Sequence, residues 1–236
     1  ITDKSPERRN QPTIHENYKN KYRESELVFV DEEKLTHFAN SLALLAGDIC
    51  CAFAYEALTK APFPPARILA ALNEMHKIVE YTAVGQMLDI VATFKEKISE
   101  REVLRIQELK TAKYTGEIQR VFRGIIQGAP SRLLEGLSAY AIPVGIAFQI
   151  QDDILGIFGE KEQIGKSVLS DIKESKKTLL VLKALERATP EQKKELKAYL
   201  GNQQVTLTEL EKVKRIVQTT GALQYSEEKA LILVNE

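Results

Sequence analysis

The sequence is poor in the residues that most often bind metals or form cross-links. It has no tryptophan, two cysteines and three histidines among 236 residues. Cys50 and Cys51 are adjacent, without a second cysteine pair or a nearby histidine, which argues against a disulfide framework and a structural zinc site. His15, His37 and His76 are scattered and lack the spacing of a triad or a metal site. A reducing, cytoplasmic location fits this composition best.

The chain also lacks an excess of charge of either sign. Lysine plus arginine and aspartate plus glutamate both number 33. This balance argues against nucleic acid or an anionic membrane as the main partner. The most apolar run, Phe38 to Leu58, is interrupted by Asp48, so we expect a buried helix and no membrane span. The first residues show no plan of a signal peptide, and we expect a truncated rather than a targeted chain.

What the sequence does contain is helix signals, and no strand pattern competes with them. Ser99 and Glu102 form a capping-box pattern, as do Thr189 with Gln192 and Thr206 with Glu209. We expect one all-α domain over residues 1 to 236, with a loop at 1 to 15 and a charged, mobile, solvated insertion at 16 to 36. Helices are predicted at Leu35 to Leu58, Pro64 to Val91, from Ser99, Thr111 to Ile126, from Ser131 with a kink or joint at Pro143, Thr178 to Ala188, from Thr189, from Thr206 to Gly221, and from about Ser226.

The stretch from Phe148 to Gly159 carries the strongest candidate for chemistry. At helical spacing, Gln149, Asp152 and Asp153 share one face beside an apolar stripe of isoleucines. Gly159 marks the expected helix end, where the helix dipole disfavours carboxylates and favours a cation. Two adjacent acids are more often a solvated face, but apolar flanks place this pair at the mouth of a core. Carboxylates without cysteine or histidine suit Mg²⁺ best.

Several separated cations could bind phosphate groups. Lys166 and Lys176 lie in loop-like contexts just after the acid pair, whereas Lys173 and Lys177 are expected to be surface lysines. The remaining candidates are the pair Arg8 and Arg9, which could bind phosphate in a bidentate manner, and Lys110 with Thr111 on a helix. Acids for Mg²⁺, cations for phosphates and an apolar helical interior together describe a site for an anionic head with an apolar tail.

These motifs resemble the trans-isoprenyl diphosphate synthases of the polyprenyl synthetase family over nearly the whole chain. The segment from Phe148 to Asp153 is similar to the second aspartate-rich motif of the family. Gly165 with Lys166, and Ser170 to Ile172 followed by Lys176 to Thr178, match the block downstream of that motif. Lys110 and Thr111 match the Lys-Thr pair in the middle of the family's chains. Asp3, followed by Arg8 and Arg9, is similar to the end of the first aspartate-rich motif and the arginine pair after it.

The resemblance implies a helical bundle around a deep central cavity, a homodimer, and Mg²⁺ held between the two motifs. The reaction would join isopentenyl diphosphate to an allylic diphosphate, giving a farnesyl or geranylgeranyl diphosphate. Lys110, Lys166 and Lys176 would stabilise the departing diphosphate, and Arg9 would bind isopentenyl diphosphate. The implied metal ligands are Asp3, Asp152 and Asp153, and the implied contacts to the allylic substrate are Arg8, Lys110, Thr111, Gln149, Lys166 and Lys176.

Three departures from the family pattern accompany this resemblance. Gly156 stands where a third acid is usual, Asn10 replaces the glycine after the arginine pair, and the insertion at 16 to 36 is long. The chain keeps only Asp3 of the first motif, so the resemblance implies that helices are missing at its N-terminus and that this polypeptide alone would be inactive. A non-catalytic partner subunit of a synthase and a terpene cyclase remain as alternatives. The retained acids and lysines favour a synthase.

Overall fold

A computed structural model describes residues 5–8, 11–25, 27, 31–159 and 169–235. The described chain is almost entirely helical, which confirms the predicted all-α class. It divides into two compact units, which are described separately below. The smaller unit comprises Ile1–Pro62 with Lys161–Ser167, and the larger comprises Phe63–Glu160 with Val168–Glu236. The single domain expected over 1 to 236 and the deep cavity stay predictions.

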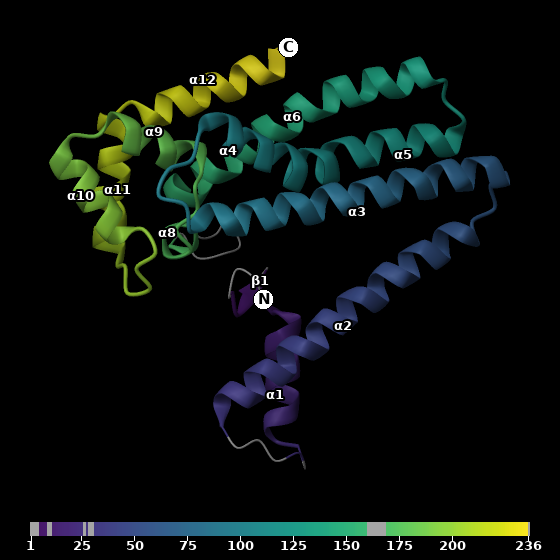
Figure 1. The fold of residues 1–236 in the computed structure, drawn as a ribbon, viewed down its shortest axis with the longest axis horizontal. Helices are drawn as coiled ribbons and strands as arrows, with labels where there is room; N and C mark the ends of the chain where they lie inside the picture. Colours follow the sequence, from purple (N-terminus) through teal and green to yellow (C-terminus); the bar gives the residue numbers. More distant parts are fainter. Residues whose placement is uncertain (1–4, 9–10, 26, 28–30, 160–168, 236) are drawn as a thin grey trace. The chain divides into compact units, whose positions relative to one another are not determined.

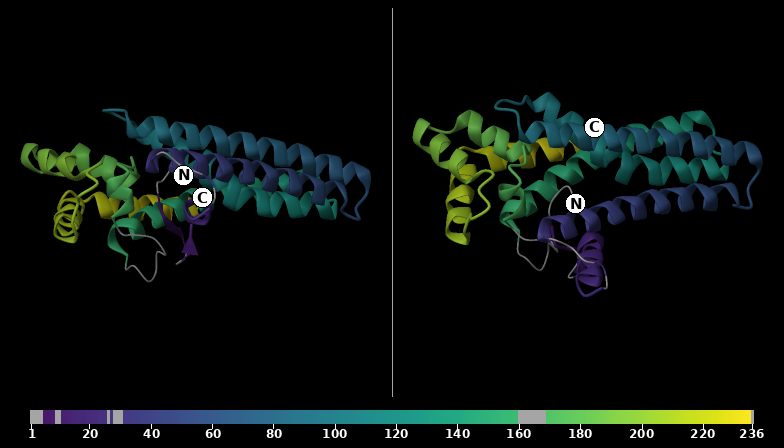
Figure 2. Two further views of the ribbon diagram at one scale, coloured as in Figure 1. Left: turned by 90° about the horizontal axis from the view of Figure 1, so that it is seen from below. Right: turned by 60° about the horizontal axis from the view of Figure 1, so that its bottom comes forward.

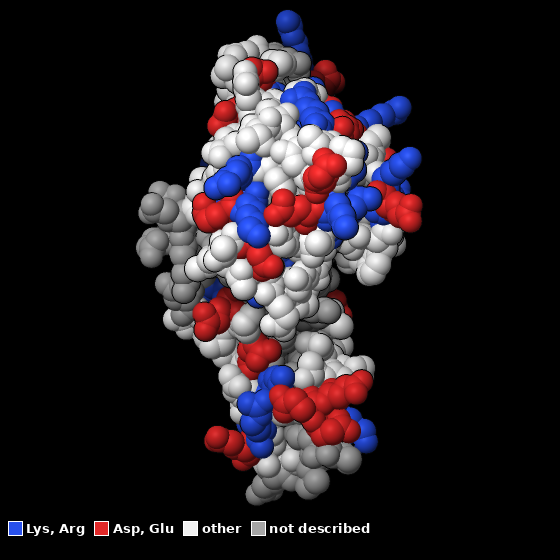
Figure 3. Space-filling model, turned by 90° about the vertical axis from the view of Figure 1, so that its left-hand side faces the viewer, with Lys and Arg blue, Asp and Glu red and all other residues white. Residues whose placement is uncertain are grey.

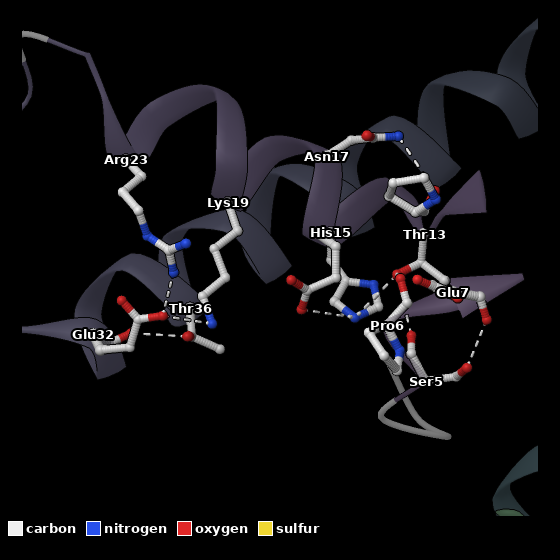
Figure 4. A network of polar contacts seen from close by, with 12 residues as sticks. Ser5, Pro6, Glu7, Thr13, His15, Asn17, Lys19, Arg23, Glu32 and Thr36 are labelled. Carbon is white, nitrogen blue, oxygen red and sulfur yellow. Dashed lines mark hydrogen bonds and ion pairs between the residues drawn. The ribbon is translucent and has the colours of Figure 1, made fainter. Parts of the chain in front are cut away.

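The smaller unit pairs two helices and a short hairpin. Its elements are β1 (Glu7–Arg8), β2 (Gln11–Pro12), α1 (Ile14–Arg23) and α2 (Glu32–Thr59). The strands are antiparallel, with Arg8 opposite Gln11. Figure 4 shows Lys19 and Arg23 of α1 reaching Glu32 at the start of α2, with N to O distances of 2.8 and 2.6 Å. These ion pairs tie the two helices together.

The first residues of this unit are more ordered than the sequence indicates. The expected loop at 1 to 15 contains the hairpin. The expected solvated connection at 16 to 36 is helical up to Arg23 and again from Glu32. Tyr18 and Tyr22 lie four residues apart on α1 and stack, and Tyr22 also meets the ring of Phe38 on α2. Aromatic contacts of this kind stabilise a helix whose other residues are mostly charged. The mobility of the insertion stays a prediction.

The larger unit contains the helix that carries the acid pair and the helices that pack around it. Capping boxes begin three of them, at Ser99, Thr189 and Thr206, as predicted. In chain order its elements are α3 (Pro65–Thr93), α4 (Glu100–Gln107), the π-helix η1 (Glu108–Glu117), α5 (Ile118–Gln127), α6 (Ser131–Phe158), α8 (Ser170–Lys173), α9 (Leu179–Arg187), α10 (Pro190–Tyr199), α11 (Leu207–Thr219) and α12 (Ala222–Asn235), as Figure 1 shows.

Two predictions about helix limits need correction. The last helix begins at Ala222 rather than near Ser226. Ser226 is fully buried and its hydroxyl donates back to the Ala222 carbonyl at 2.9 Å, so it lies inside the helix and does not cap it. Gly221, with φ of 69°, separates α12 from α11. Helix α6 continues through Pro143, so the predicted joint is not found there, whereas the predicted kink stays a prediction.

The core of the larger unit lies between α6, α9, α11 and α12, which contact one another. Helix α5 contacts both α3 and α6, and Figure 2 shows these long helices running alongside one another in the right-hand view. Ile150 and Ile157 of α6 are buried in this core, as the apolar stripe predicted. Because the isoleucine stripe faces the core, the adjoining face of α6 carries Gln149 and Asp152 at its border.

Two glycines let η1 approach its neighbouring helices very closely. A Cβ atom at Gly85 of α3 would lie 2.5 Å from the backbone nitrogen of Lys110, and one at Gly145 of α6 would lie 2.6 Å from the Cα of Ala112. Neither distance leaves room for a side chain. The π-helix is a rare conformation that occurs frequently at functional sites. The backbone of η1 packs against α3 on one side and α6 on the other, at the residues Lys110 and Ala112 that flank Thr111.

Two described helices, α2 and α6, are long and apolar enough to cross a membrane when judged by length and composition. Within the most apolar window, 11% of α2 and 28% of α6 is buried. Core helices of soluble proteins satisfy the same criterion. The expectation of no membrane span therefore stays a prediction.

Substitution of Gly145 tests the close packing around η1. We expect Gly145→Ala to lower the free energy of unfolding by about 1–3 kcal/mol, because the new methyl group overpacks the contact with Ala112. Gly136, on the same helix, has no atom within 4 Å of the place that a new methyl group would take. Gly136→Ala should therefore raise stability by roughly 0.5–1 kcal/mol. Urea unfolding measures both, and equal shifts would contradict this account.

Candidate functional site

The larger unit brings together most of the predicted site residues that the structure describes. Thr111 and Lys110 come from η1, Gln149 and Asp153 from α6, and Lys176 from the turn after α8. They line one pocket of about 60 Å³. The same pocket is lined by five further residues, Asp89, Ile106, Gln107, Lys177 and Thr178. Asp152 is next to Asp153 on α6 and is half-buried.

The other predicted residues cannot be placed in this pocket. Asp3, Arg9 and Lys166 lie outside the described residues. Arg8 lies on β1 of the smaller unit and is exposed. Its hairpin is held by Thr13, whose backbone N–H donates to the Pro6 carbonyl at 2.9 Å and whose hydroxyl lies 3.1 Å from the same oxygen (Figure 4). The roles predicted for these four residues stay predictions.

Asp153 is the buried centre of the polar network in the pocket, with 6% of its surface exposed. The amide of Gln149 donates to its Oδ1 at 2.9 Å, and the amide of Gln107 donates to its Oδ2 at 3.0 Å. Burial, with the nearby charges of Asp171 and Asp152, raises the pKa of Asp153 to about 7, although Gln149 and Lys176 oppose the rise. The carboxylate therefore lies where added positive charge would stabilise it.

Lys176 is held in the pocket by Asp171, which is 3% exposed. The Nζ to Oδ1 distance is 2.8 Å, and Glu174 lies 3.6 Å from the same ammonium group. Burial alone would lower the pKa of Lys176, but the charge and hydrogen bond of Asp171 outweigh it and raise the pKa. Lys176 is thus a fixed positive charge at the pocket, close to Asp153.

The missing third acid at Gly156 has a structural counterpart. A Cβ atom at this glycine would overlap Oδ2 of Asp171, so the space beside Gly156 is taken by a carboxylate from another segment. Asp171 reaches this place because α8 contacts α6. The glycine that departs from the family pattern is therefore the residue that admits Asp171.

The π-helix presents its two polar residues to opposite neighbours. Lys110 donates to Oδ2 of Asp89 on α3 at 2.6 Å. Thr111 donates to the Oε1 of Gln149 on α6 at 2.8 Å. The second contact continues through Gln149 to Asp153, so hydroxyl, amide and carboxylate form one connected chain. Such chains orient each member for a ligand.

The acids of the pocket fit a divalent cation by charge and by donor type. The carboxylates of Asp152 and Asp171 both act on Asp153 electrostatically, and the ammonium group of Lys176 opposes them. Among the charged groups that act on Asp153, the acids therefore outnumber the lysine. Carboxylate oxygens are the donors that Mg²⁺ prefers. Among the described residues, no three side chains drawn from histidine, cysteine, aspartate and glutamate lie close enough together to hold a metal ion as they stand.

Some residues at this pocket have no role assigned to them by the sequence patterns. Asp171 belongs to the block downstream of the second aspartate-rich motif, but no function is predicted for it. Gln107 belongs to no motif, and Lys177 is predicted to be a surface lysine. Lys177 lines the pocket, and burial and the charge of Lys197 lower its pKa. In the sequence, Gln107 stands among the apolar residues Val103, Ile106 and Leu109, which the structure buries. A polar residue in this apolar setting was the one sequence signal that pointed to Gln107.

The charges outside the pocket do not gather by sign on the face drawn in Figure 3. Over the helices of the larger unit, lysine and arginine lie among aspartate and glutamate. Several charged groups of this unit form ion pairs within one helix, such as Lys214 with Glu211 at 2.8 Å. The charge balance of the sequence is thus repeated locally on this face.

Substitution of Gly156 tests the contact with Asp171. We expect Gly156→Ala to lower the free energy of unfolding by roughly 1–3 kcal/mol, because the methyl group displaces Asp171 from Lys176. In an Asp171→Ala background the overlap is gone, so the same substitution should be neutral or stabilising. Urea unfolding of the four proteins gives the coupling, and additive effects would show that the two residues do not compete for this space.

Comparisons with known proteins agree with this arrangement. The polyprenyl synthetase family matches residues 1–219. The geranylgeranyl diphosphate synthase of Saccharolobus solfataricus is 35% identical over 187 residues, which cover 78% of this chain and 56% of that protein. The (2E,6E)-farnesyl diphosphate synthase of Mycobacterium tuberculosis is 35% identical over 144 residues, 61% of this chain and 39% of that protein.

Solved structures extend the similarity to the fold. The geranylgeranyl pyrophosphate synthase of Corynebacterium glutamicum, complexed with isoprenyl diphosphate and magnesium, has a TM-score of 0.90 and 28% identity, covering 98% of this chain and 64% of that one. The enzyme of Pyrococcus horikoshii has a TM-score of 0.80 and 26% identity, covering 100% and 65%. The chain spans between 39% and 65% of the length of these four proteins. It belongs to the polyprenyl synthetase family.

Proposed function

We propose that the protein containing this chain is a Mg²⁺-dependent trans-prenyltransferase. It would condense isopentenyl diphosphate with an allylic diphosphate to give a longer trans-prenyl diphosphate, of farnesyl or geranylgeranyl length. The observation that carries this proposal is the pocket in which buried acids meet lysines held by their own ion pairs. The names of the similar synthases support the same substrate class.

The chemistry proposed for the site separates charge. The allylic carbon–oxygen bond breaks, and its electron pair leaves with the diphosphate. The double bond of isopentenyl diphosphate then attacks the allylic cation, and the proton lost from the product passes to the departed diphosphate. Bound at Asp152 and Asp153, Mg²⁺ would supply positive charge that neutralises the leaving diphosphate.

The residues of this chain hold the substrate in the required orientation. Lys110 and Lys176 place ammonium groups at the pocket, and their partners Asp89 and Asp171 fix them there. A fixed charge stabilises a developing anion without reorganising during the reaction. Thr111 and Gln149 orient Asp153 through two hydrogen bonds in series. Arg8, Arg9, Lys166 and Asp3 are proposed to complete the site.

We also infer a homodimer and a cytoplasmic location. Val84, Met87, Leu88 and Val91 are exposed and form one apolar stripe on α3. A stripe at this spacing is typical of a helix face that packs against another helix. The location follows from the scarcity of cysteine.

The dimer is tested by placing charge on this stripe. We expect Val91→Lys in the full-length protein to shift the mass measured by sedimentation equilibrium from dimer to monomer, because a buried unpaired ammonium group is costly. The exposed position Glu135 on α6 provides the control, and Glu135→Lys should leave the dimer intact. If Val91→Lys remains a dimer, the apolar stripe on α3 is not the dimer interface.

The catalytic role is tested by removing the half-buried acid. Asp152→Ala in the full-length protein should lower turnover of isopentenyl diphosphate and an allylic diphosphate by about 10²-fold or more, because Mg²⁺ loses a ligand. Product is measured by chromatography with C5, C10 and C15 allylic substrates. Excess chelator should abolish product in the wild type.

The matched control is Glu135→Ala, an exposed acid on the same helix, which should keep wild-type turnover. Helicity, followed by circular dichroism, should be the same in all three proteins. Wild-type turnover in Asp152→Ala would show that the acid pair has no catalytic role and is only a solvated face of the helix. A protein without activity under any of these conditions would favour the partner-subunit alternative.

A further inference from the structure

Gln107 occupies an unusual place in the larger unit. It is the last residue of α4, is 5% exposed, and has the buried side chains of Val103, Ile106 and Leu109 close to it in sequence. Burying an amide among apolar groups is unfavourable unless both of its ends form hydrogen bonds. Its Nε2 donates to Oδ2 of Asp153 at 3.0 Å, which satisfies one end.

The hydrogen bond from Gln107 differs from the other amide contact to the same carboxylate. Gln149 lies four residues before Asp153 on α6 and moves with it. Gln107 lies 46 residues away on another helix. Its hydrogen bond therefore sets the position of Asp153 relative to α4 and to Lys110, three residues further along the chain.

The other end of the Gln107 amide has no partner among the described residues. Its Oε1 is buried and accepts no hydrogen bond there. Leaving such an acceptor unpaired costs roughly 1–3 kcal/mol. Because Gln107 lines the pocket, a ligand in the pocket can satisfy this oxygen only with a hydrogen-bond donor. An ionised diphosphate has acceptors alone, whereas a hydrated cation presents water O–H groups.

We propose that Gln107 is a positioning residue for the metal site: its Nε2 fixes the carboxylate of Asp153, and its Oε1 accepts a hydrogen bond from a water molecule of a hydrated Mg²⁺ ion. This inference rests on the proposed function. It assigns the residue no contact with the reacting carbon atoms. Residues that orient metal ligands in this way typically change metal affinity or activity by 10–100-fold when replaced.

The test uses the full-length protein and the substitution Gln107→Met, which keeps length and volume but removes both hydrogen-bonding ends. Mg²⁺ binding in the presence of inorganic pyrophosphate is measured by isothermal titration calorimetry. We expect Mg²⁺ affinity to fall by roughly 10–100-fold. The Mg²⁺ concentration for half-maximal turnover should rise in parallel, with KM for isopentenyl diphosphate unchanged.

Gln127→Met is the matched control, because Gln127 is also the last residue of a helix but is exposed. It should bind Mg²⁺ as the wild type does. Gln107→Asn keeps the amide but is too short by one methylene group, so it carries the same expectation if Gln107→Met does not fold. Wild-type Mg²⁺ affinity in either folded variant, alongside weakened binding in Asp152→Ala, would overturn the role of Gln107 and leave the proposed function standing. Unchanged Mg²⁺ binding in Asp152→Ala as well would instead contradict the proposed function.

Discussion

The buried carboxylate of Asp153 is the constraint on which the rest of the larger unit depends. An ionised acid that is 6% exposed needs hydrogen bonds or positive charge around it. The protein supplies amides from two helices, Gln149 and Gln107, together with the charge of Lys176. Burial still raises its pKa to about 7. These groups therefore stabilise the ionised form of Asp153 incompletely, which suits this carboxylate to a bound cation.

Meeting that requirement takes close helix packing. Lys110, Thr111 and Gln107 reach their partners because the chain from α4 into η1 lies tightly against α3 and α6. Gly85 and Gly145 permit this approach, since a side chain at either position would meet backbone atoms. The same principle operates at Gly156, where the absent side chain leaves room for Asp171. Small residues in this unit are thus as important to the polar site as the charged ones.

Ion pairs in the pocket serve orientation more than stability. Pairs such as Lys110 with Asp89 and Lys176 with Asp171 join different elements or turns and are partly or largely buried. Partly buried pairs contribute uncertain net stability because desolvation opposes their attraction. Their value lies in holding each ammonium group at one place. In the smaller unit, the pairs of Lys19 and Arg23 with Glu32 similarly join α1 to α2.

The sequence alone determined the helical class, the capping boxes at Ser99, Thr189 and Thr206, and the acid pair at the end of a long helix. These depend on spacing within a few residues, which local periodicity and capping chemistry specify. It missed α1 and the early start of α12, where aromatic contacts and burial of Ser226 outweighed local signals. Only the tertiary structure decided that Gln107 faces Asp153 and that Asp171 lies beside Gly156. Those contacts join residues far apart in the chain, and their geometry follows from how closely helices pack, which no local pattern encodes.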